Sequence, residues 1–367
     1  MMKQNLRCAI RNTVTSSLLL LTLLPSGKAA EVITIGKGSG ILWEGLPFNQ
    51  TLSGSIGERN LNPIYGLASI SLSSTRCQLL NTLTTISGYR VYQLIPGVGL
   101  IPRSTAHVTY TTSNGVVNTM TGTIGLPETR ATTSTGETIT DPPTYTWCLP
   151  PSMTASTTFY QYQSIRTSTL SGSWVLVADG TQTSREIIIP PVYFGSYASQ
   201  TPDDRSVIIL PSNITLRIST LECSVNTPLT INFGTIARNT QANSELAIRT
   251  ESLTTSCGQP TDQINANINV QFRPLTGLYQ GEPTRLALQQ GGGYITGEID
   301  NTTASNGACT ATSGIPFDNS PLKIGAITTA QTSITTSNQI TWRLCSGGAS
   351  LPVGAVNAST EMLVTFN

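Results

Sequence analysis

The sequence has a single histidine, His107, so any serine or cysteine nucleophile that needed a histidine base would have to use it. His107 lies in the alternating stretch 105–112, on the same face as Thr109 and Thr111, which indicates a solvated side chain. No GxSxG motif accompanies it. The 19 acidic residues could include the two carboxylates of a glycosidase, but sequence spacing does not bring two of them together. We therefore expect a protein that is not an enzyme.

The cysteines are the second group that could do chemistry. Seven are present, and six remain once Cys8 is removed with the leader described below: Cys77, Cys148, Cys223, Cys257, Cys309 and Cys345. No CxxC motif and no histidine cluster accompanies them, so we expect neither a metal site nor a cofactor. An even number of cysteines after an export signal predicts three disulfides. Their grouping into three successive couples favours sequential pairing among the possible connectivities.

The first residues have the order of a secretory signal. Lys3, Arg7 and Arg11 precede an apolar run at 17–24, and the small residues Gly27 and Ala29 fit a cleavage site, so we assign residues 1–29 to a signal peptide. The run is too short to span a bilayer, and no other stretch approaches that length, so we expect no membrane span. The leader carries four of the 20 basic residues, which leaves 16 against 19 acidic ones. This balance, without a basic run, argues against a nucleic-acid partner.

The elements that must position any site are strands. Only 11% of the residues are charged, and the chain has 57 threonines, 32 glycines and 21 prolines, a composition that disfavours helices and suits strands joined by tight turns. Alternating candidates occur at 68–72, 89–94, 105–112, 174–178, 207–210, 214–218, 229–233, 264–272, 340–344 and 362–366. Turn pairs such as Asn114-Gly115 and Asp179-Gly180 separate them. We predict an all-β protein with two β-sandwich domains.

The boundary between the two domains is predicted near 202–213, where a charged turn is followed by a Pro-Ser-Asn linker at 211–213. The first domain then comprises residues 30–210 and the second residues 214–367. The pairs Cys77–Cys148, Cys223–Cys257 and Cys309–Cys345 would each remain within one domain.

A sugar-binding surface in the first domain would need aromatic platforms beside polar groups. The aromatic candidates are Trp147 and Tyr145, which lie beside Cys148, and Tyr160 and Tyr162. Tyr160, Tyr162 and Arg166 follow a two-residue period that is compatible with one strand face. The alternative for Trp147 is that it packs on the disulfide.

The second domain has a recognisable beginning and end. From Cys223 the chain reads Cys-Ser-Val-Asn-Thr-Pro-Leu-Thr-Ile-Asn-Phe-Gly-Thr-Ile, and from Ala355 it ends Ala-Val-Asn-Ala-Ser-Thr-Glu-Met-Leu-Val-Thr-Phe-Asn. Residues 214–367 resemble the pilin domain of chaperone-usher fimbriae of Gram-negative bacteria. Phe366 stands where the family usually has tyrosine, and the third cysteine pair lies outside the common pattern. Because a further domain precedes it, the whole chain is similar to the two-domain tip adhesins of such fimbriae.

The resemblance implies an immunoglobulin-like sandwich that lacks its last strand. Met362, Val364 and Phe366 would border the resulting groove, which a periplasmic chaperone and then the donor strand of an adjacent pilin subunit would fill. The outer-membrane usher would be a further partner, and the protein would be secreted via the periplasm to the fimbrial tip on the cell surface. The first domain would be lectin-like and bind a host glycan or glycoprotein. The alternative for the three groove residues is an ordinary core strand of a complete sandwich.

Two other functions remain open at this point. The chain could be a minor structural pilin or an assembly terminator that binds no receptor. It could also be a secreted carbohydrate-active enzyme with a binding module, although the lone histidine argues against this.

Overall fold

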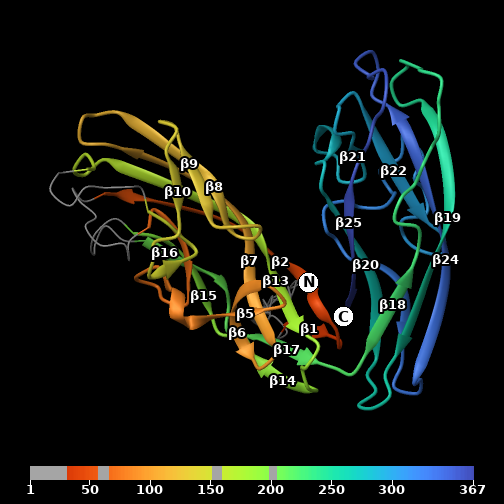
Figure 1. Ribbon diagram of the computed structural model, residues 1–367, viewed down its shortest axis with the longest axis horizontal. Coiled ribbons are helices and arrows are strands. Elements are labelled where there is room, and N and C mark those ends of the chain that lie inside the picture. Colours follow the sequence, from red (N-terminus) through yellow and green to blue (C-terminus); the bar gives the residue numbers. More distant parts are fainter. Residues whose placement is uncertain (1–30, 57–65, 151–158, 198–204) are drawn as a thin grey trace, which may run out of the picture. The chain divides into compact units, whose positions relative to one another are not determined.

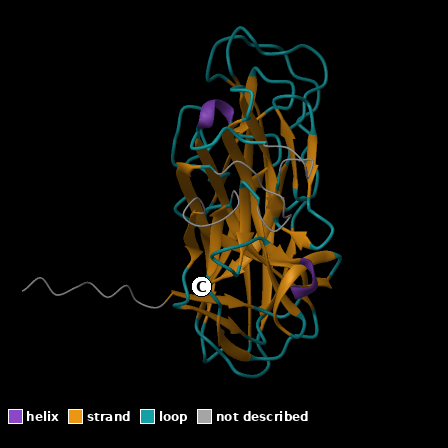
Figure 2. Ribbon diagram, turned by 90° about the vertical axis from the view of Figure 1, so that its left-hand side faces the viewer, coloured by secondary structure: helices purple, strands orange, loops and turns teal. Residues whose placement is uncertain are grey.

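The computed structural model describes residues 31–56, 66–150, 159–197 and 205–367. Strands make up nearly all of the regular structure, as Figure 2 shows. The described residues contain two short 3-10 helices, Leu80–Thr82 and Tyr279–Gly281, and no α-helix. The predicted all-β fold is therefore confirmed. The expected signal peptide lies outside the described residues, and none of the helices described is long and apolar enough to cross a membrane.

Two-residue alternation explains why these segments form strands. In β7 (Val98–Thr111), Ala106, Val108 and Tyr110 are buried, whereas Thr105 and His107 are exposed. Threonine suits the outer positions because its branched side chain fits the pleated surface and its hydroxyl remains hydrated. β7 therefore contributes one face to a core and leaves a hydroxyl-rich face outside.

The first hydrophobic core is built by the strands drawn red to green in Figure 1. Its widest sheet has the order β10-β9-β8-β7-β13-β2, and β12-β3-β15-β16 forms another. β1 pairs in parallel with β17, and a short pair joins β11 to β4. The bounds are β1 Glu31–Ile35, β2 Ser39–Ser55, β3 Ala68–Ser71, β4 Gln78–Leu79, β5 Leu83–Ile86, β6 Tyr89–Ile95, β8 Val117–Gly125, β9 Arg130–Thr133, β10 Thr138–Thr140, β11 Tyr145–Thr146, β12 Cys148–Leu149, β13 Ile165–Asp179, β14 Arg185–Ile188, β15 Val192–Ser196, β16 Arg205–Leu210 and β17 Ile214–Ile218.

The second core receives side chains from two sheets. One has the order β18-β19-β24-β22-β21, and in the other β25, β20 and β23 are neighbours. Leu253 and Leu344 enter the core from the first sheet, and Ile268 and Phe272 enter it from the second. The bounds are β18 Glu222–Asn226, β19 Glu245–Gly258, β20 Ala266–Pro274, β21 Leu286–Ala287, β22 Gly293–Ile299, β23 Leu322–Ile327, β24 Ser333–Ser346 and β25 Thr360–Phe366. This arrangement is a β-sandwich.

The chain changes from one core to the other slightly later than the sequence suggested. Ile214, Leu216 and Ile218 of β17 pack in the first core, whereas Leu221 is the first residue of the second. The reason is the parallel pairing of β17 with β1, a long-range contact that local composition does not reveal. We therefore propose that the second domain begins near Leu221 instead of Ile214.

The three disulfides are sequential, as predicted: Cys77–Cys148, Cys223–Cys257 and Cys309–Cys345. Cys223 and Cys257 are opposite residues of β18 and β19, so this bridge fixes the register of the first hairpin of the second domain. The second bridge packs in the second core, whereas the third forms a separate small cluster with Tyr294. No bridge therefore joins the residues before β17 to those after it.

Candidate functional site

The last strand, β25, is the element on which the candidate site is built. It pairs antiparallel with β20 along its whole length. The amide of Asn267 donates to the carbonyl of Asn367 at 2.7 Å, the reverse bond measures 3.4 Å, and Leu275 N donates to Ser359 O at 2.9 Å. Because hydrogen-bonded pairs alternate in an antiparallel ladder, the odd-numbered residues of 359–367 direct their backbone groups towards β20. The even-numbered residues direct theirs towards the opposite edge.

That opposite edge is almost entirely without a partner strand. The one pair found there within the described residues joins Phe366 to Thr34 of β1. The outward backbone groups of Thr360, Met362 and Val364 therefore have no hydrogen-bonded partner strand in the part of the chain that the structure describes. We call these three residues the free edge. Peptide groups of this kind form a template for a further strand.

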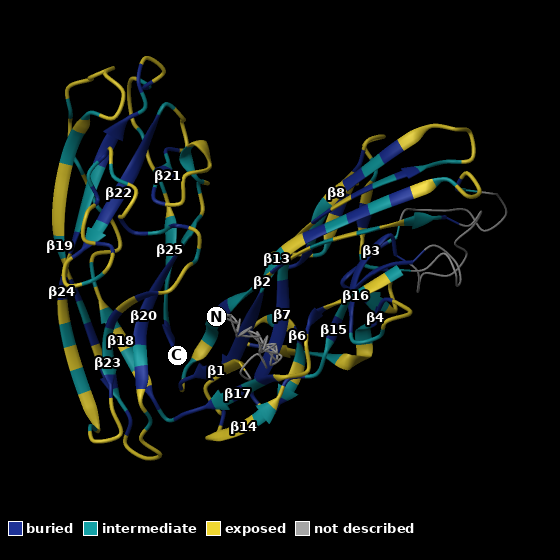
Figure 3. Ribbon diagram, turned by 180° about the vertical axis from the view of Figure 1, so that it is seen from behind, coloured by how far each residue is buried: buried dark blue, intermediate teal, exposed yellow. Residues whose placement is uncertain are grey.

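The core beside the free edge is also incompletely covered. Met362 and Val364 pack on the second core but are only half-buried, whereas their partners on β20, Phe272 and Val270, are buried. Figure 3 shows this contrast along β20 and β25. A strand laid along the free edge would cover these side chains and satisfy the peptide groups together.

A second segment leaves apolar side chains of this core uncovered. Residues 227–244, between β18 and β19, contain no strand. Leu229 is fully exposed, and Phe233 and Ile236 pack on the second core while remaining half-buried. Arg249 holds this segment through a 3.0 Å bond from Nη2 to the carbonyl of Phe233. The sandwich thus has an extended segment that packs against its core without joining either sheet.

The three predicted groove residues differ in their exposure. Met362 and Val364 lie on the free edge, whereas Phe366 is buried and its backbone faces β1. Their even numbering places all three on one face of the strand, as the sequence pattern indicates. Whether a partner binds there is not tested by the fold, so their role in a groove stays a prediction.

The five predicted ligand contacts do not form one surface. Trp147, Tyr160 and Arg166 are buried in the first core region, Tyr145 is half-buried, and Tyr162 is exposed. Tyr160 and Tyr162 do not share a strand face, because a turn follows Tyr160 and β13 begins only at Ile165. The common face inferred from the two-residue period is therefore wrong.

The guanidinium of Arg166 is buried and is satisfied by one side-chain hydroxyl and two backbone carbonyls. Its Nε donates to Ser196 Oγ at 2.9 Å, its Nη2 donates to Ser196 O at 2.6 Å, and its Nη1 bonds to Ser55 O. A buried guanidinium needs such partners to offset its loss of hydration. Arg166 thus joins β2, β13 and β15, and its contacts give it a structural role.

Asp141 is a perturbed acid that sequence reasoning did not single out. Its Oδ2 accepts a bond from Thr146 Oγ1 at 2.8 Å, and its Oδ1 accepts one from Cys148 N at 3.1 Å. Burial raises its pKa from 3.8 to about 6, although both hydrogen bonds act in the opposite direction. The carboxyl therefore holds the chain around Trp147 against the first disulfide.

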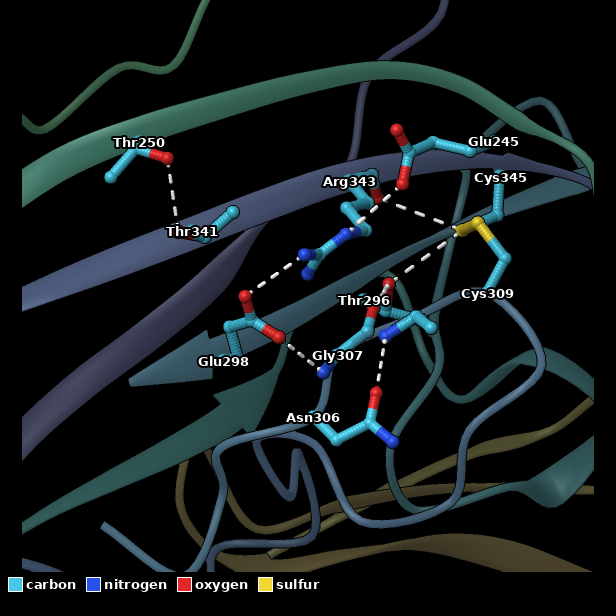
Figure 4. Close-up of polar contacts among 11 residues, drawn as sticks. Glu245, Thr250, Thr296, Glu298, Asn306, Gly307, Cys309, Thr341, Arg343 and Cys345 are labelled. Carbon is cyan, nitrogen blue, oxygen red and sulfur yellow. Dashed lines mark hydrogen bonds and ion pairs between the residues drawn. A yellow bond between two sulfur atoms is a disulfide. The ribbon is translucent and has the colours of Figure 1, made fainter. Parts of the chain in front are cut away.

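An ion-pair network accompanies the third disulfide, as Figure 4 shows. Arg343 Nε lies 3.0 Å from Glu245 Oε2, and Nη2 lies 2.9 Å from Glu298 Oε1. Glu298 Oε2 also accepts a 2.7 Å bond from the amide of Gly307, which is close in sequence to Cys309. Burial acts to raise the pKa of Glu298, but the bonds from Arg343 and Gly307 give a net lowering. These contacts fix the disulfide loop to the sheet, which is a structural role.

His107 is exposed on the outer face of β7, as its pattern predicts. Its Nδ1 lies 2.8 Å from Thr121 Oγ1 on β8. No group of three or more histidine, cysteine, aspartate or glutamate side chains suited to a metal occurs within the described ranges. The most distinctive feature of the described surface is therefore the free edge of β25.

The chain has similar solved structures but matches no family model. No model of a protein family and no curated protein matches the chain. Among solved structures, the CupB6 tip adhesin from Pseudomonas aeruginosa is 14% identical with a TM-score of 0.30, covering 94% of this chain and 89% of that one. A structure described as a chaperone-tip adhesin complex vital for synergistic activation of CFA/I fimbriae biogenesis is 10% identical with a TM-score of 0.23, covering 93% of this chain and 97% of that one. The first is a tip adhesin and the second a chaperone-tip adhesin complex, and neither likeness is close enough to transfer a site to this chain.

Proposed function

We propose that the chain is a two-domain fimbrial tip adhesin whose second domain is held in the fibre by a donated strand. The observation that carries this proposal is the free edge at Thr360, Met362 and Val364, beside a partly uncovered core. A complete sandwich would bury these residues under a further strand or protect the edge by charge, proline or a bulge. Within β25 the one charged residue is Glu361, whose carboxylate bonds to Arg273 of β20 at 2.8 Å.

The geometry fits an extended peptide as the partner. Thr360, Met362 and Val364 each offer an outward amide and carbonyl, spaced two residues apart as in a β-ladder. The partner's alternate side chains would lie on the half-buried Met362 and Val364, so they should be apolar. A strand with apolar residues at every second position is the complementary sequence.

On the proposed export route the second domain would bind several partners in turn. A free edge beside partly exposed apolar side chains is an aggregation hazard during transport, so a periplasmic chaperone would cover it before assembly. The usher in the outer membrane would then pass the domain to the donor strand of the adjacent pilin subunit. The protein would finish at the fimbrial tip on the bacterial surface.

The first domain would bind the host ligand, which we propose to be a glycan. The domain has its own core and its own disulfide, so it does not depend on the second domain for cross-linking. A minor pilin or assembly terminator would share the free edge but bind no receptor. Binding of a glycan by the first domain is therefore what separates the adhesin from these alternatives.

The test of the docking step uses the mature chain and a synthetic peptide of the N-terminal segment of a pilin encoded beside it. At a peptide concentration of about 100 times the dissociation constant, stabilisation should reach about 2.7 kcal/mol. This should raise the melting temperature of the second domain by roughly 5 to 10 °C. Introducing a charge with Val364→Asp should abolish the shift, because the carboxylate would be buried beneath the added strand.

The matched control is Thr335→Asp, which places the same charge on an exposed position of β24 in the other sheet. This variant should keep the full stabilisation by the peptide. A mature chain whose melting temperature does not respond to the peptide, although it is folded and oxidised, would show that the sandwich needs no donor. The proposal would then be wrong.

A further inference from the structure

The outer face of the widest sheet in the first domain carries an ordered array of hydroxyl groups. One row crosses six strands through successive register pairs: Thr138, Thr132, Thr121, His107, Thr169 and Thr51. Thr169 is half-buried and the other five are exposed, whereas the intervening residues Met120, Val108 and Leu170 are buried. The row therefore lies on the solvent side of the sheet.

Two further rows run beside the first. On one side lie Thr140, Arg130, Thr123, Thr105, Ser171 and Asn49, and on the other lie Thr119, Thr109, Thr167 and Ser53. All of these are exposed or half-buried. We call the three rows together the hydroxyl face. It contains no aliphatic residue and no acid.

Contacts between strands hold parts of the hydroxyl face in place. Thr105 Oγ1 lies 3.1 Å from Ser171 Oγ, and Ser53 Oγ lies 3.3 Å from Thr167 Oγ1. His107 Nδ1 is 2.8 Å from the hydroxyl of Thr121. Because threonine is also restricted at χ1, a ligand that bonded to these groups would lose little side-chain entropy in ordering them.

The near absence of charge in these three rows distinguishes them from another hydroxyl-rich face of the protein. The outer face of the larger sheet of the second domain is also rich in serine and threonine, but there Arg343 forms ion pairs with Glu245 and Glu298. On the hydroxyl face the charged or titratable residues are Arg130 and His107, and Arg130 lies 3.8 Å from the neighbouring Glu128. Threonine content alone therefore does not distinguish the two faces, whereas their charge does.

The spacing of the array suits a repeating polymer. Neighbouring strands lie about 4.8 Å apart, so a row that crosses six strands is about 24 Å long. The spacing between neighbouring strands is comparable with the length of one sugar ring along an extended polysaccharide. Each hydroxyl can both donate and accept a hydrogen bond, and each threonine methyl can contact the carbon–hydrogen face of a sugar.

We propose that the hydroxyl face binds an uncharged, extended polysaccharide that lies across the strands along these rows. This inference rests on the proposed adhesin function and names the surface and the class of ligand. The lack of charge favours a neutral polymer, because an anionic one would meet no matching set of cations. Successive rings would contact successive strands, so affinity would grow with chain length.

The test measures binding of the mature chain, with the donor peptide bound, to mannan and hydroxyethylcellulose as neutral probes and to hyaluronan as the anionic probe. Retardation in affinity gels should occur with a neutral polymer and not with hyaluronan. The double variant Thr121→Val/Thr169→Val keeps the side-chain shape and removes the hydroxyls on both sides of His107. Loss of about two hydrogen bonds should weaken binding about tenfold.

The matched control is Thr250→Val/Thr341→Val, a hydroxyl pair 3.0 Å apart on the outer face of the second domain, shown in Figure 4. This variant should bind as the unaltered chain does. Equal loss in both variants, unchanged binding in the first, a preference for hyaluronan, or no binding to either neutral polymer would each overturn the inference. The thermal shift by the donor peptide is measured on the same samples, so failure of glycan binding is distinguished from failure of the docking proposal.

Discussion

Replacing Asp141 with asparagine should remove a large part of the pH dependence of the first domain's stability. In the folded protein burial raises the pKa of this carboxyl to about 6, against an ordinary value of 3.8. Between these two values the native carboxyl keeps its proton while the unfolded one has lost it. The native state then binds more protons, so stability is greatest below the unfolded pKa and falls as pH rises through the folded pKa.

The size of the effect follows from the difference between the two pKa values. A shift of about 2 units, at about 1.4 kcal/mol for each unit, corresponds to about 3 kcal/mol lost between about pH 4 and about pH 7. Asparagine cannot ionise, and its side-chain oxygen can still accept the bond from Cys148 N. The Asp141→Asn variant should therefore lack this 3 kcal/mol slope.

The assay is denaturant unfolding of the mature chain over this pH range, followed by the fluorescence of the tryptophans. Asp179→Asn is the control, because hydrogen bonds from Thr181 lower the pKa of that exposed carboxyl and give a contribution of opposite sign. The difference between the profiles of the unaltered chain and Asp141→Asn isolates the slope due to Asp141, and the same difference for Asp179→Asn should have the opposite sign. An unaltered chain and an Asp141→Asn variant with parallel stability profiles would refute the account of this buried carboxyl.

Three further changes have defined outcomes. Arg166→Leu should cost at least about 3 kcal/mol in denaturant unfolding, because the carbonyl of Ser196 loses a charged donor inside the core. The Cys223→Ala/Cys257→Ala variant should lose about 4 kcal/mol of second-domain stability, because the bridge closes a loop between cysteines 34 residues apart. Denaturant unfolding measures this loss as well. Tyr294→Phe should cost about 1 kcal/mol in thermal unfolding, since its hydroxyl donates to Asn243 Oδ1 at 2.7 Å or to Cys309 O at 2.8 Å. Losses indistinguishable from zero would contradict each assignment.

Features that depend on local periodicity could be predicted from the sequence. The alternation in 105–112 correctly placed His107 outside and Val108 inside, because neighbouring residues of a strand face opposite sides. The sequential disulfides were also predictable, since each couple joins segments of one domain. The alternation of the last strand gave the shared face of Met362, Val364 and Phe366.

Features that depend on distant partners could not be predicted in this way. Arg166 resembles a surface residue until Ser196 and Ser55 are seen to satisfy its guanidinium. The pKa of Asp141 reflects its burial, which depends on how the strands pack. The change from the first core to the second near Leu221 follows from the parallel pairing of β17 with β1, and no local signal marks that pairing.

Amide hydrogen exchange at single residues of β25 is the most direct test of the free edge. In the mature chain without a donor, the amides of Thr360, Met362 and Val364 should exchange fast, because they point away from β20. Those of Glu361, Leu363 and Thr365 should exchange slowly in the same sample. Addition of the donor peptide should protect the first set and leave the second set unchanged. Slow exchange throughout the strand without the peptide would mean that the edge is already paired, and the account of an incomplete sandwich would be contradicted.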